Sequence, residues 1–384
     1  MAMSDDPLWL LNPAARRADG FRGLFDASDY ADVARFFAGR IDLTPTPLRR
    51  LPSLAMWLGI GELWLKDEST RFDLDAFKIA GVWYAVDRLK REDGIRPPRD
   101  GGDRPVLVTA STGNHGRAVA RVAARSGFRA RIFVPAGTVP HRVASIAAEG
   151  AEPVMVEGTY EQAVARAATE ADGHGWTVVS DTTYPGYDRI PRLIMAGYTW
   201  LLTESAAQWA PSPPPDVVLV QAGVGGLAGA VASWVAFRYG EERPFVIACE
   251  ATGAACVLAS VRAGHPVTLI DPVRTMMAGL RCAQPSTAAW PAMSAGIDAC
   301  VAVSDASSVA AMRRLARPAG RDPVVVAGPS GACGLAVLDA LATEPGLAPL
   351  RRACNLQNRS RVLVINTEGN TDPDLYRREV GECA

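Results

Sequence analysis

The sequence has no excess of charge of one sign and no long apolar run. Its formal net charge is -1 over 384 residues, and neither Lys nor Arg forms a basic tract. We therefore expect no nucleic-acid partner and no binding to an anionic membrane surface. No apolar stretch reaches the roughly 18 residues of a membrane-spanning helix. The N-terminus carries Asp5 and Asp6 where a secretory signal carries positive charge, so we expect a cytoplasmic protein whose partners are small molecules.

Cysteine and histidine patterns that bind metals are also absent. The seven cysteines are an odd number and include no C-x-x-C pair, which argues against a disulfide framework and a zinc site. The four histidines form no H-E-x-x-H motif, so we predict no catalytic metal. The cysteines are expected to be buried thiols, at positions 249, 256, 282, 300, 333, 354 and 383.

Lysine is scarce, and its scarcity narrows the choice of a reactive amine. Chemistry that needs a primary amine has only Lys66, Lys78 and Lys90 available. Lys66 and Lys90 have charged neighbours, and we expect both to be solvated. Lys78 lies between Phe77 and Ile79 in an apolar stretch, where an ammonium is poorly solvated. Lys78 is therefore the candidate reactive amine.

Apolar β-rich runs alternate with Ala-rich helical runs along most of the chain. This alternation predicts parallel sheets with helical returns, an α/β fold. The strand-and-helix pairs are too many for one sheet, and the Pro-rich segment 209–215 interrupts them, which indicates two layered domains with a ligand between them. The expected strands are 105–109, 130–134, 153–156, 177–180, 217–221 and 245–249. The expected helices are 116–126, 141–149, 160–173, 190–208, 229–239 and 254–263.

A glycine loop after the strand 217–221 is a candidate phosphate site. Glycines let several backbone N–H groups point at one anion, and the following helix N-terminus adds partial positive charge. The spacing also fits a dinucleotide fingerprint, with Glu250 as the candidate ribose-binding acid, and a plain turn is the third option. The loop residues are Gly223, Val224, Gly225, Gly226 and Leu227.

A second polar loop follows the apolar run 106–108. The hydroxyls and amides of Ser111, Thr112 and Gly113 are suited to binding a carboxylate. Ser111 or Thr112 as a cap of the next helix is the ordinary explanation of such a turn. Capping alone does not explain Asn114.

These two loops, together with the segment Asp75-Ala76-Phe77-Lys78, resemble the tryptophan synthase β superfamily, which is fold type II of the pyridoxal-phosphate enzymes. Within it, the segments 181–187, 275–280 and 366–373 resemble the diaminopropionate ammonia-lyases. The last of them reads Asn-Thr-Glu-Gly-Asn-Thr-Asp-Pro and is far more specific than a glycine loop. The likeness covers essentially the whole chain and favours pyridoxal 5'-phosphate (PLP) over a dinucleotide.

The resemblance implies a two-domain fold and a homodimer. Each domain is expected to be a mostly parallel twisted sheet flanked by helices. Residues 1–90 and 214–384 are expected to form the large cofactor-binding domain, and residues 91–213 the small domain on the substrate side.

The resemblance also implies a role for the residues around the cofactor. Lys78 is expected to form a Schiff base with PLP, the loop 223–227 to hold its phosphate, and Asn114 to bind the ring oxygen O3′. Thr367 is expected to face the pyridine nitrogen. A neutral hydroxyl there leaves the ring a weaker electron sink, which favours prompt loss of a β-substituent.

The implied activity is the α,β-elimination of 2,3-diaminopropionate, through an aminoacrylate, to pyruvate and ammonia. Either Lys78 or Asp181 is expected to take the Cα proton, and Asp181 to protonate the departing amine; a turn cap is the alternative role of Asp181. The residues expected to bind the substrate are Ser111, Thr112, Gly113 and His115.

Three positions depart from the family pattern. Thr112 stands where these enzymes carry a second aspartate, and two carboxylates allow both stereoisomers to react, so we expect a preference for the L-isomer. Segment 327–332 lacks the glutamate that related enzymes usually have there. Asp75 stands where the family commonly has Asn or Ser, and it either offsets that loss or marks altered substrate recognition.

Four other functions remain open from the sequence. A β-replacement synthase or a dehydratase passes through the same aminoacrylate with another β-substituted amino acid. A nicotinamide-dependent dehydrogenase would use the glycine loop. A catalytically silent relative would bind the cofactor only.

Overall fold

The computed structural model describes residues 8–15, 20–40, 44–97 and 102–381. Asp5, Asp6 and Cys383 lie outside the described residues, so the expectations placed on them stay predictions. Within the described part of the chain, no helix combines the length and apolar character of a membrane span.

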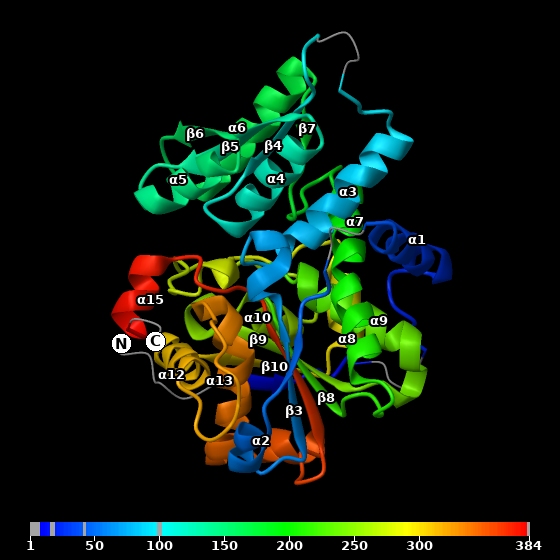
Figure 1. Ribbon diagram of the computed structural model, residues 1–384, viewed down its shortest axis with the longest axis vertical. Coiled ribbons are helices and arrows are strands. Elements are labelled where there is room, and N and C mark those ends of the chain that lie inside the picture. The colour runs from blue at the N-terminus through cyan, green and yellow to red at the C-terminus, as the bar shows by residue number, and fades with distance from the viewer. Residues whose placement is uncertain (1–7, 16–19, 41–43, 98–101, 382–384) are drawn as a thin grey trace.

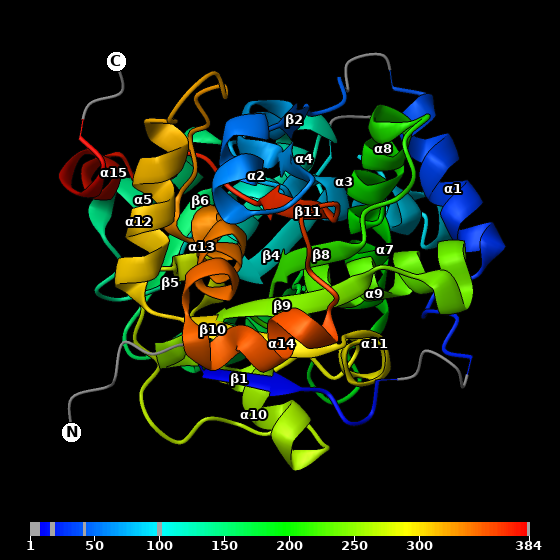
Figure 2. The same cartoon turned by 90° about the horizontal axis from the view of Figure 1, so that it is seen from below.

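Two sheets organise the described chain (Figure 1). The larger sheet consists, in spatial order, of β1 (Leu8–Leu11), β10 (Ala299–Val303), β9 (Phe245–Ala251), β8 (Val217–Gln221), β11 (Arg361–Asn366), β3 (Glu62–Asp67) and β2 (Leu48–Arg50). Its inner strands are parallel, and the edge strands β1 and β2 are antiparallel to their neighbours. Figure 2 shows β1 and β2 at opposite edges of this sheet.

The smaller sheet is parallel throughout. It consists, in spatial order, of β6 (Glu152–Val156), β5 (Arg129–Pro135), β4 (Val106–Ala110) and β7 (Thr177–Val178). All four strands fall inside the predicted small domain, residues 91–213. The domain bounds themselves stay a prediction.

Helices cover both faces of the larger sheet, and each face has its own hydrophobic core. Val218 and Val220 of β8 belong to one core, and Val217 and Leu219 to the other, as the twofold alternation of a strand requires. The first core includes residues of α1 (Ala27–Ala38), α3 (Lys78–Glu92), α7 (Arg189–Tyr198), α8 (Trp200–Trp209), α9 (Gly226–Tyr239), α10 (Cys256–Ala263) and α11 (Trp290–Gly296). The second includes residues of α2 (Pro52–Leu58), α12 (Asp305–Ala316), α13 (Pro329–Thr343), α14 (Ala348–Ala353) and α15 (Pro373–Glu379).

The smaller sheet lies between two helical layers. Residues of α4 (Asn114–Arg125) and α5 (Pro140–Ala148) join the first core of the larger sheet, while α6 (Tyr160–His174) packs on the opposite face in a small core of its own. The first core is therefore shared by the two sheets, with α3, α4 and α7 between them.

The expected fold class is confirmed, because two mostly parallel sheets flanked by helices are present. All six expected strands occur, but the sequence pattern missed β1, β2, β3, β10 and β11. The helix expected at 190–208 is wrong as a single element: it divides into α7 and α8 at Thr199. The Thr199 hydroxyl donates to the carbonyl of Ala196 at 2.6 Å, a local hydrogen bond of the kind that competes with helical continuation.

Helices α3 and α7 approach each other through glycines. A Cβ added to Gly81 would lie 2.4 Å from Tyr198 Cε1 and 2.5 Å from the Ile194 carbonyl oxygen. A Cβ added to Gly197 would lie 2.8 Å from Gly81 Cα. These distances leave no room for a side chain, so the backbones of the two helices meet directly.

The expectation that Lys66 is solvated is wrong. Lys66 is fully buried on β3, and its Nζ donates to Glu204 Oε2 of α8 at 2.8 Å and to the Thr46 carbonyl at 2.7 Å. Arg71 pairs with the same Glu204 at 2.6 Å and with Glu68 at 2.7 Å. Burial lowers the pKa of Lys66, although both carboxylates act to raise it. The charged residues next to Lys66 in the sequence suggest exposure to solvent. They mislead because β3 is an inner strand of the sheet, which the local sequence does not reveal.

The expectation of buried thiols is confirmed for five of the described cysteines, at positions 249, 256, 300, 333 and 354, and is wrong for Cys282, which is half-buried.

Candidate active site

Lys78 is the first residue of α3 and lies beside the end of β11. The segment before it pairs with the segment after β11: Phe77 N donates to the Thr367 carbonyl at 3.1 Å, and Gly369 N donates to the Asp75 carbonyl at 2.9 Å. Ala76 and Glu368 form an antiparallel bridge between these two hydrogen bonds. The pairing fixes the start of α3, and with it Lys78, at the carboxyl end of the larger sheet.

Lys78 and Asp181 form an ion pair between the two sheets. Lys78 Nζ donates a short hydrogen bond to Asp181 Oδ2, and the side chains of Lys78 and Asp181 are 19% and 13% exposed. Asp181 follows β7 of the smaller sheet. Burial acts to raise the pKa of the Asp181 carboxyl, but the charges of His115 and Lys78 and the hydrogen bond from Lys78 outweigh it and hold this pKa well below its usual range.

His115 lies behind Asp181. Its Nε2 is 2.8 Å from the Val179 carbonyl oxygen, and its Nδ1 is 3.7 Å from Asp181 Oδ2. Because a carbonyl oxygen only accepts, Nε2 carries the proton, and burial lowers the pKa of the imidazole. His115 thus contacts Asp181, and its expected binding of substrate stays a prediction.

The glycine loop follows β8 and opens α9, as expected, with the helix beginning at Gly226 rather than at residue 229. Gly225 has φ 90°, a left-handed conformation that favours glycine. No side chain caps α9, and its first turn holds no acidic residue, so its N-terminal N–H groups and partial positive charge are free for an anion. Tyr198 connects this loop to Lys78: its ring packs on Phe77 at 4.7 Å and approaches Gly226.

Gly223 is required by a close approach of the chain. A Cβ there would lie 2.7 Å from the Gly279 carbonyl oxygen and 3.1 Å from Cys282 Sγ. Gly279 is in turn held by its N–H, which donates to Ser330 Oγ at 3.0 Å. The segment 275–280, picked out by its family likeness, therefore supports the glycine loop from behind.

Asn114 and Thr367 both adjoin Glu368, a residue to which the sequence pattern gave no role. Asn114 Nδ2 donates to Glu368 Oε2 at 2.5 Å, and Ser330 N donates to Glu368 Oε1 at 3.1 Å. Thr367 is 4% exposed at the end of β11. The sequence signal that could have found Glu368 is its place two residues beyond a buried strand and next to Thr367.

In the polar loop after β4, hydrogen bonds identify Ser111 as a residue that stabilises the fold. Ser111 Oγ accepts from Gly116 N at 2.9 Å and from Gly113 N at 3.2 Å, so its hydroxyl caps the start of α4. Thr112 is half-buried. A Cβ added to Gly113 would meet no described atom within 4 Å, which leaves open space over the backbone there. Substrate binding by these three residues stays a prediction.

Glu250, the candidate ribose-binding acid, has a structural role. It is fully buried, and its two oxygens accept from Val257 N and Leu258 N at 2.8 Å each. It therefore caps the start of α10, and burial raises its pKa to about 8. A fully buried cap has no oxygen left for a ribose, so this part of the dinucleotide hypothesis is wrong.

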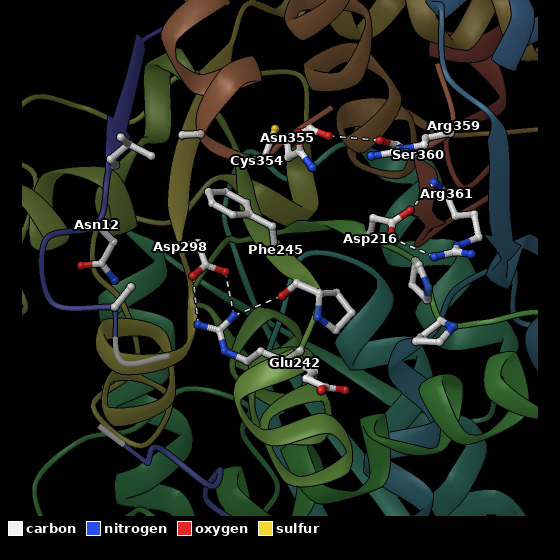
Figure 3. Close-up of a pocket in the computed structure, with 17 residues that line it drawn as sticks. Asn12, Asp216, Glu242, Phe245, Asp298, Cys354, Asn355, Arg359, Ser360 and Arg361 are labelled. Carbon is white, nitrogen blue, oxygen red and sulfur yellow. Dashed lines mark hydrogen bonds and ion pairs between the residues drawn. The ribbon is translucent and has the colours of Figure 1, made fainter. Parts of the chain in front are cut away.

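A cavity of about 1050 Å³ lies at the end of the larger sheet opposite to Lys78, where the inner strands begin (Figure 3). It is lined at the amino ends of β8, β9 and β11 by Asp216, Phe245 and Arg361. Ligands of open α/β sheets bind at the carboxyl ends of the strands. This cavity includes none of the residues expected in the active site.

The site has a counterpart among known proteins. Residues 40–368 match the family described as pyridoxal-phosphate dependent enzyme. A diaminopropionate ammonia-lyase of Escherichia coli K12 is 36% identical over 370 residues, which cover 94% of this chain and 93% of that protein. The chain belongs to the diaminopropionate ammonia-lyase family of pyridoxal-phosphate dependent enzymes.

Solved structures of the E. coli family member share the whole fold. Its complex with an aminoacrylate-PLP azomethine reaction intermediate has a TM-score of 0.89 and 34% identity, covering 98% of this chain and 97% of that chain. Its complex with D-serine has a TM-score of 0.89 and 33% identity over the same shares.

The residues present fit the PLP of this family. One amine, Lys78, lies near an uncapped helix N-terminus that suits a phosphate, and Asn114 and Thr367 offer polar atoms at the carboxyl ends of β4 and β11. Among the described residues, no group of His, Cys, Asp and Glu is arranged to hold a metal ion.

We predict that borohydride reduction of the purified yellow protein attaches the cofactor to Lys78 alone. Lys66 is fully buried and ion-paired, so it is inaccessible, and Lys90 lies in the last turn of α3. Peptide mass mapping checks this. The variant Lys78→Ala is expected to be colourless, whereas Lys90→Ala stays yellow; label on Lys66 or Lys90 in the native chain would contradict the assignment.

Proposed function

We propose that this chain converts 2,3-diaminopropionate and water to pyruvate and two molecules of ammonia. The observation that carries the proposal is the ion pair of Lys78 and Asp181, one amine against one half-buried carboxylate, in a chain 36% identical to a named diaminopropionate ammonia-lyase. The cofactor, bound at Lys78, supplies the electron sink that makes the Cα proton of an amino acid labile.

The protein's part is to hold and move protons at two neighbouring atoms. Lys78 Nζ and Asp181 Oδ2 share a hydrogen bond, so one takes the Cα proton while the other supplies the proton that the departing β-amine needs. The low pKa of Asp181 depends on the positive charges beside it. Burial acts against these charges and favours the protonated carboxyl, which suits Asp181 to carry a proton to the leaving group.

The substrate carboxylate is proposed to lie on the loop after β4. The open space over Gly113 leaves room for an anion beside the backbone there, and Ser111 holds the loop in shape. His115 keeps Asp181 in place from behind. Association of two copies, which rests on the family likeness, and a cytoplasmic location are part of the proposal. Light scattering distinguishes a dimer from a monomer.

The reaction itself is tested by product stoichiometry. With L-2,3-diaminopropionate and no added nucleophile, we expect one pyruvate and two ammonia per substrate, measured by coupled assays. A requirement for an added thiol or amine would identify a β-replacement synthase, and faster turnover of serine or threonine would identify a dehydratase.

Replacing the carboxylate of Asp181 should remove general acid-base catalysis without removing the cofactor. We expect Asp181→Asn to lower kcat by about 10²–10⁴-fold, with the visible absorption of the bound cofactor retained. Steady-state kinetics and absorption spectra check this. Asp172→Asn, at an exposed position of α6, is the matched control, and an equal kcat in both variants would rule out the role given to Asp181.

We further propose that the enzyme prefers the L-isomer. The Thr112 hydroxyl does not act as a base at neutral pH, so Asp181 serves one face of Cα only. We expect kcat/KM for the L-isomer to exceed that for the D-isomer by on the order of 10²-fold, and Thr112→Asp to narrow this ratio. Thr169→Asp on α6 is the control. Equal turnover of the two isomers by the native chain would disprove the preference.

A further inference from the structure

We propose that Glu368 is a positioning residue that determines which atom of the Asn114 amide faces the cofactor. The inference rests on the proposed function in one respect, since it takes Asn114 to lie against the cofactor's ring oxygen. Glu368 ends up at this place because the pairing of segments 75–77 and 367–369 puts it one residue beyond Thr367.

Both carboxylate oxygens of Glu368 are committed. Oε1 accepts from Ser330 N at 3.1 Å, at the start of α13, and Oε2 accepts from Asn114 Nδ2 at 2.5 Å. The backbone carbonyl of Glu368 accepts from Gly328 N at 2.9 Å. The residue is 5% exposed, so these contacts leave its side chain no alternative direction.

The surrounding chain is shaped around this carboxylate. A Cβ added to Gly328 would lie 3.0 Å from Glu368 Oε1 and 2.6 Å from the Gly369 carbonyl oxygen. A Cβ added to Gly331 would lie 2.6 Å from the Glu368 carbonyl oxygen. Segment 327–332 carries no acid of its own, and Glu368, from the end of β11, brings the carboxylate to this segment.

The chemistry of the Glu368–Asn114 pair determines the orientation of the Asn114 amide. A carboxylate accepts hydrogen bonds and donates none, whereas an asparagine amide presents a donor and an acceptor of nearly equal size. Glu368 therefore requires the nitrogen of Asn114, and not its oxygen, on the side that faces it. The second N–H of the same nitrogen stays available for the ring oxygen, which is an acceptor. A reversed amide would place two acceptors against each other.

The same hydrogen bond also joins the two sheets, because Glu368 follows β11 and Asn114 opens α4. A simple tether between the sheets is thus the competing explanation. It predicts that any bond of equal strength between these positions is sufficient, while the positioning role requires the bond to run in one direction.

The test compares Glu368→Gln with the double variant Glu368→Gln/Asn114→Asp. Glutamine both donates and accepts, so Glu368→Gln frees the amide to reverse. We expect the Kd of PLP for the apoprotein to rise by roughly tenfold and the absorption maximum of the bound cofactor to shift. Fluorescence titration and visible spectra measure both, with Glu344→Gln, at an exposed position after α13, as the control.

In the double variant, glutamine donates to the new aspartate, which restores the link between the sheets but turns an acceptor toward the ring oxygen. We expect the thermal midpoint of the apoprotein to recover, while PLP affinity and the spectrum do not. Recovery of PLP affinity and of the spectrum in the double variant would show that Glu368 only links the two sheets. A Glu368→Gln variant with native PLP affinity and a native spectrum would also overturn the positioning role. So would a Glu368→Gln apoprotein that does not fold.

Failure of this inference is distinguishable from failure of the proposed function. Reductive labelling of Lys78 and release of pyruvate by the native chain report on the function alone. Native behaviour in both, together with an unaffected Glu368→Gln, leaves the function standing and removes only the role of Glu368.

Discussion

The backbone pairing of segments 75–77 and 367–369 determines how the active site is assembled. It places the first residue of α3 beside the end of β11, which lies between β8 and β3 in the larger sheet. The glycine loop extends from the same end of β8. Lys78, the glycine loop and the polar residues after β11 therefore converge, because parallel strands end at the same end of the sheet. The smaller sheet adds Asp181 and Asn114 from the other side.

The loop that leads to Lys78 is held by charges buried beneath it. Phe72, at φ 49°, adopts a left-handed conformation, which costs about 1–2 kcal/mol for an ordinary residue. Arg71, immediately before it, is fully buried between Glu68 and Glu204, and Lys66 completes the cluster. Removing one member of such a cluster leaves a buried charge unpaired, so the cluster holds the unusual backbone in place.

Motifs with local chemistry could be predicted from the sequence. The apolar surroundings of Lys78, the glycine loop and the alternation of strands and helices all depend on neighbouring residues, and the structure places them as expected. Asp181 was assigned by resemblance, and it meets Lys78 across the two sheets.

Features that depend on distant parts of the chain could not be predicted. Lys66 has charged sequence neighbours, and its burial follows from β3 lying inside the sheet, opposite a glutamate of α8. Glu368 and Asn114 are 254 residues apart in the sequence, so no local pattern reports their contact. The inner strands β3 and β11 carry charged or polar residues at their ends, which hid their apolar runs.

The direct contact of α3 and α7 at Gly81 and Gly197 restricts how this enzyme can change during evolution. Lys78 begins one of these helices, and the segment that starts at Asp181 leads into the other. A side chain at either glycine would push the helices apart and separate the amine from the carboxylate. New substrate preferences are therefore expected in loops that leave this crossing intact, such as the one that holds Thr112.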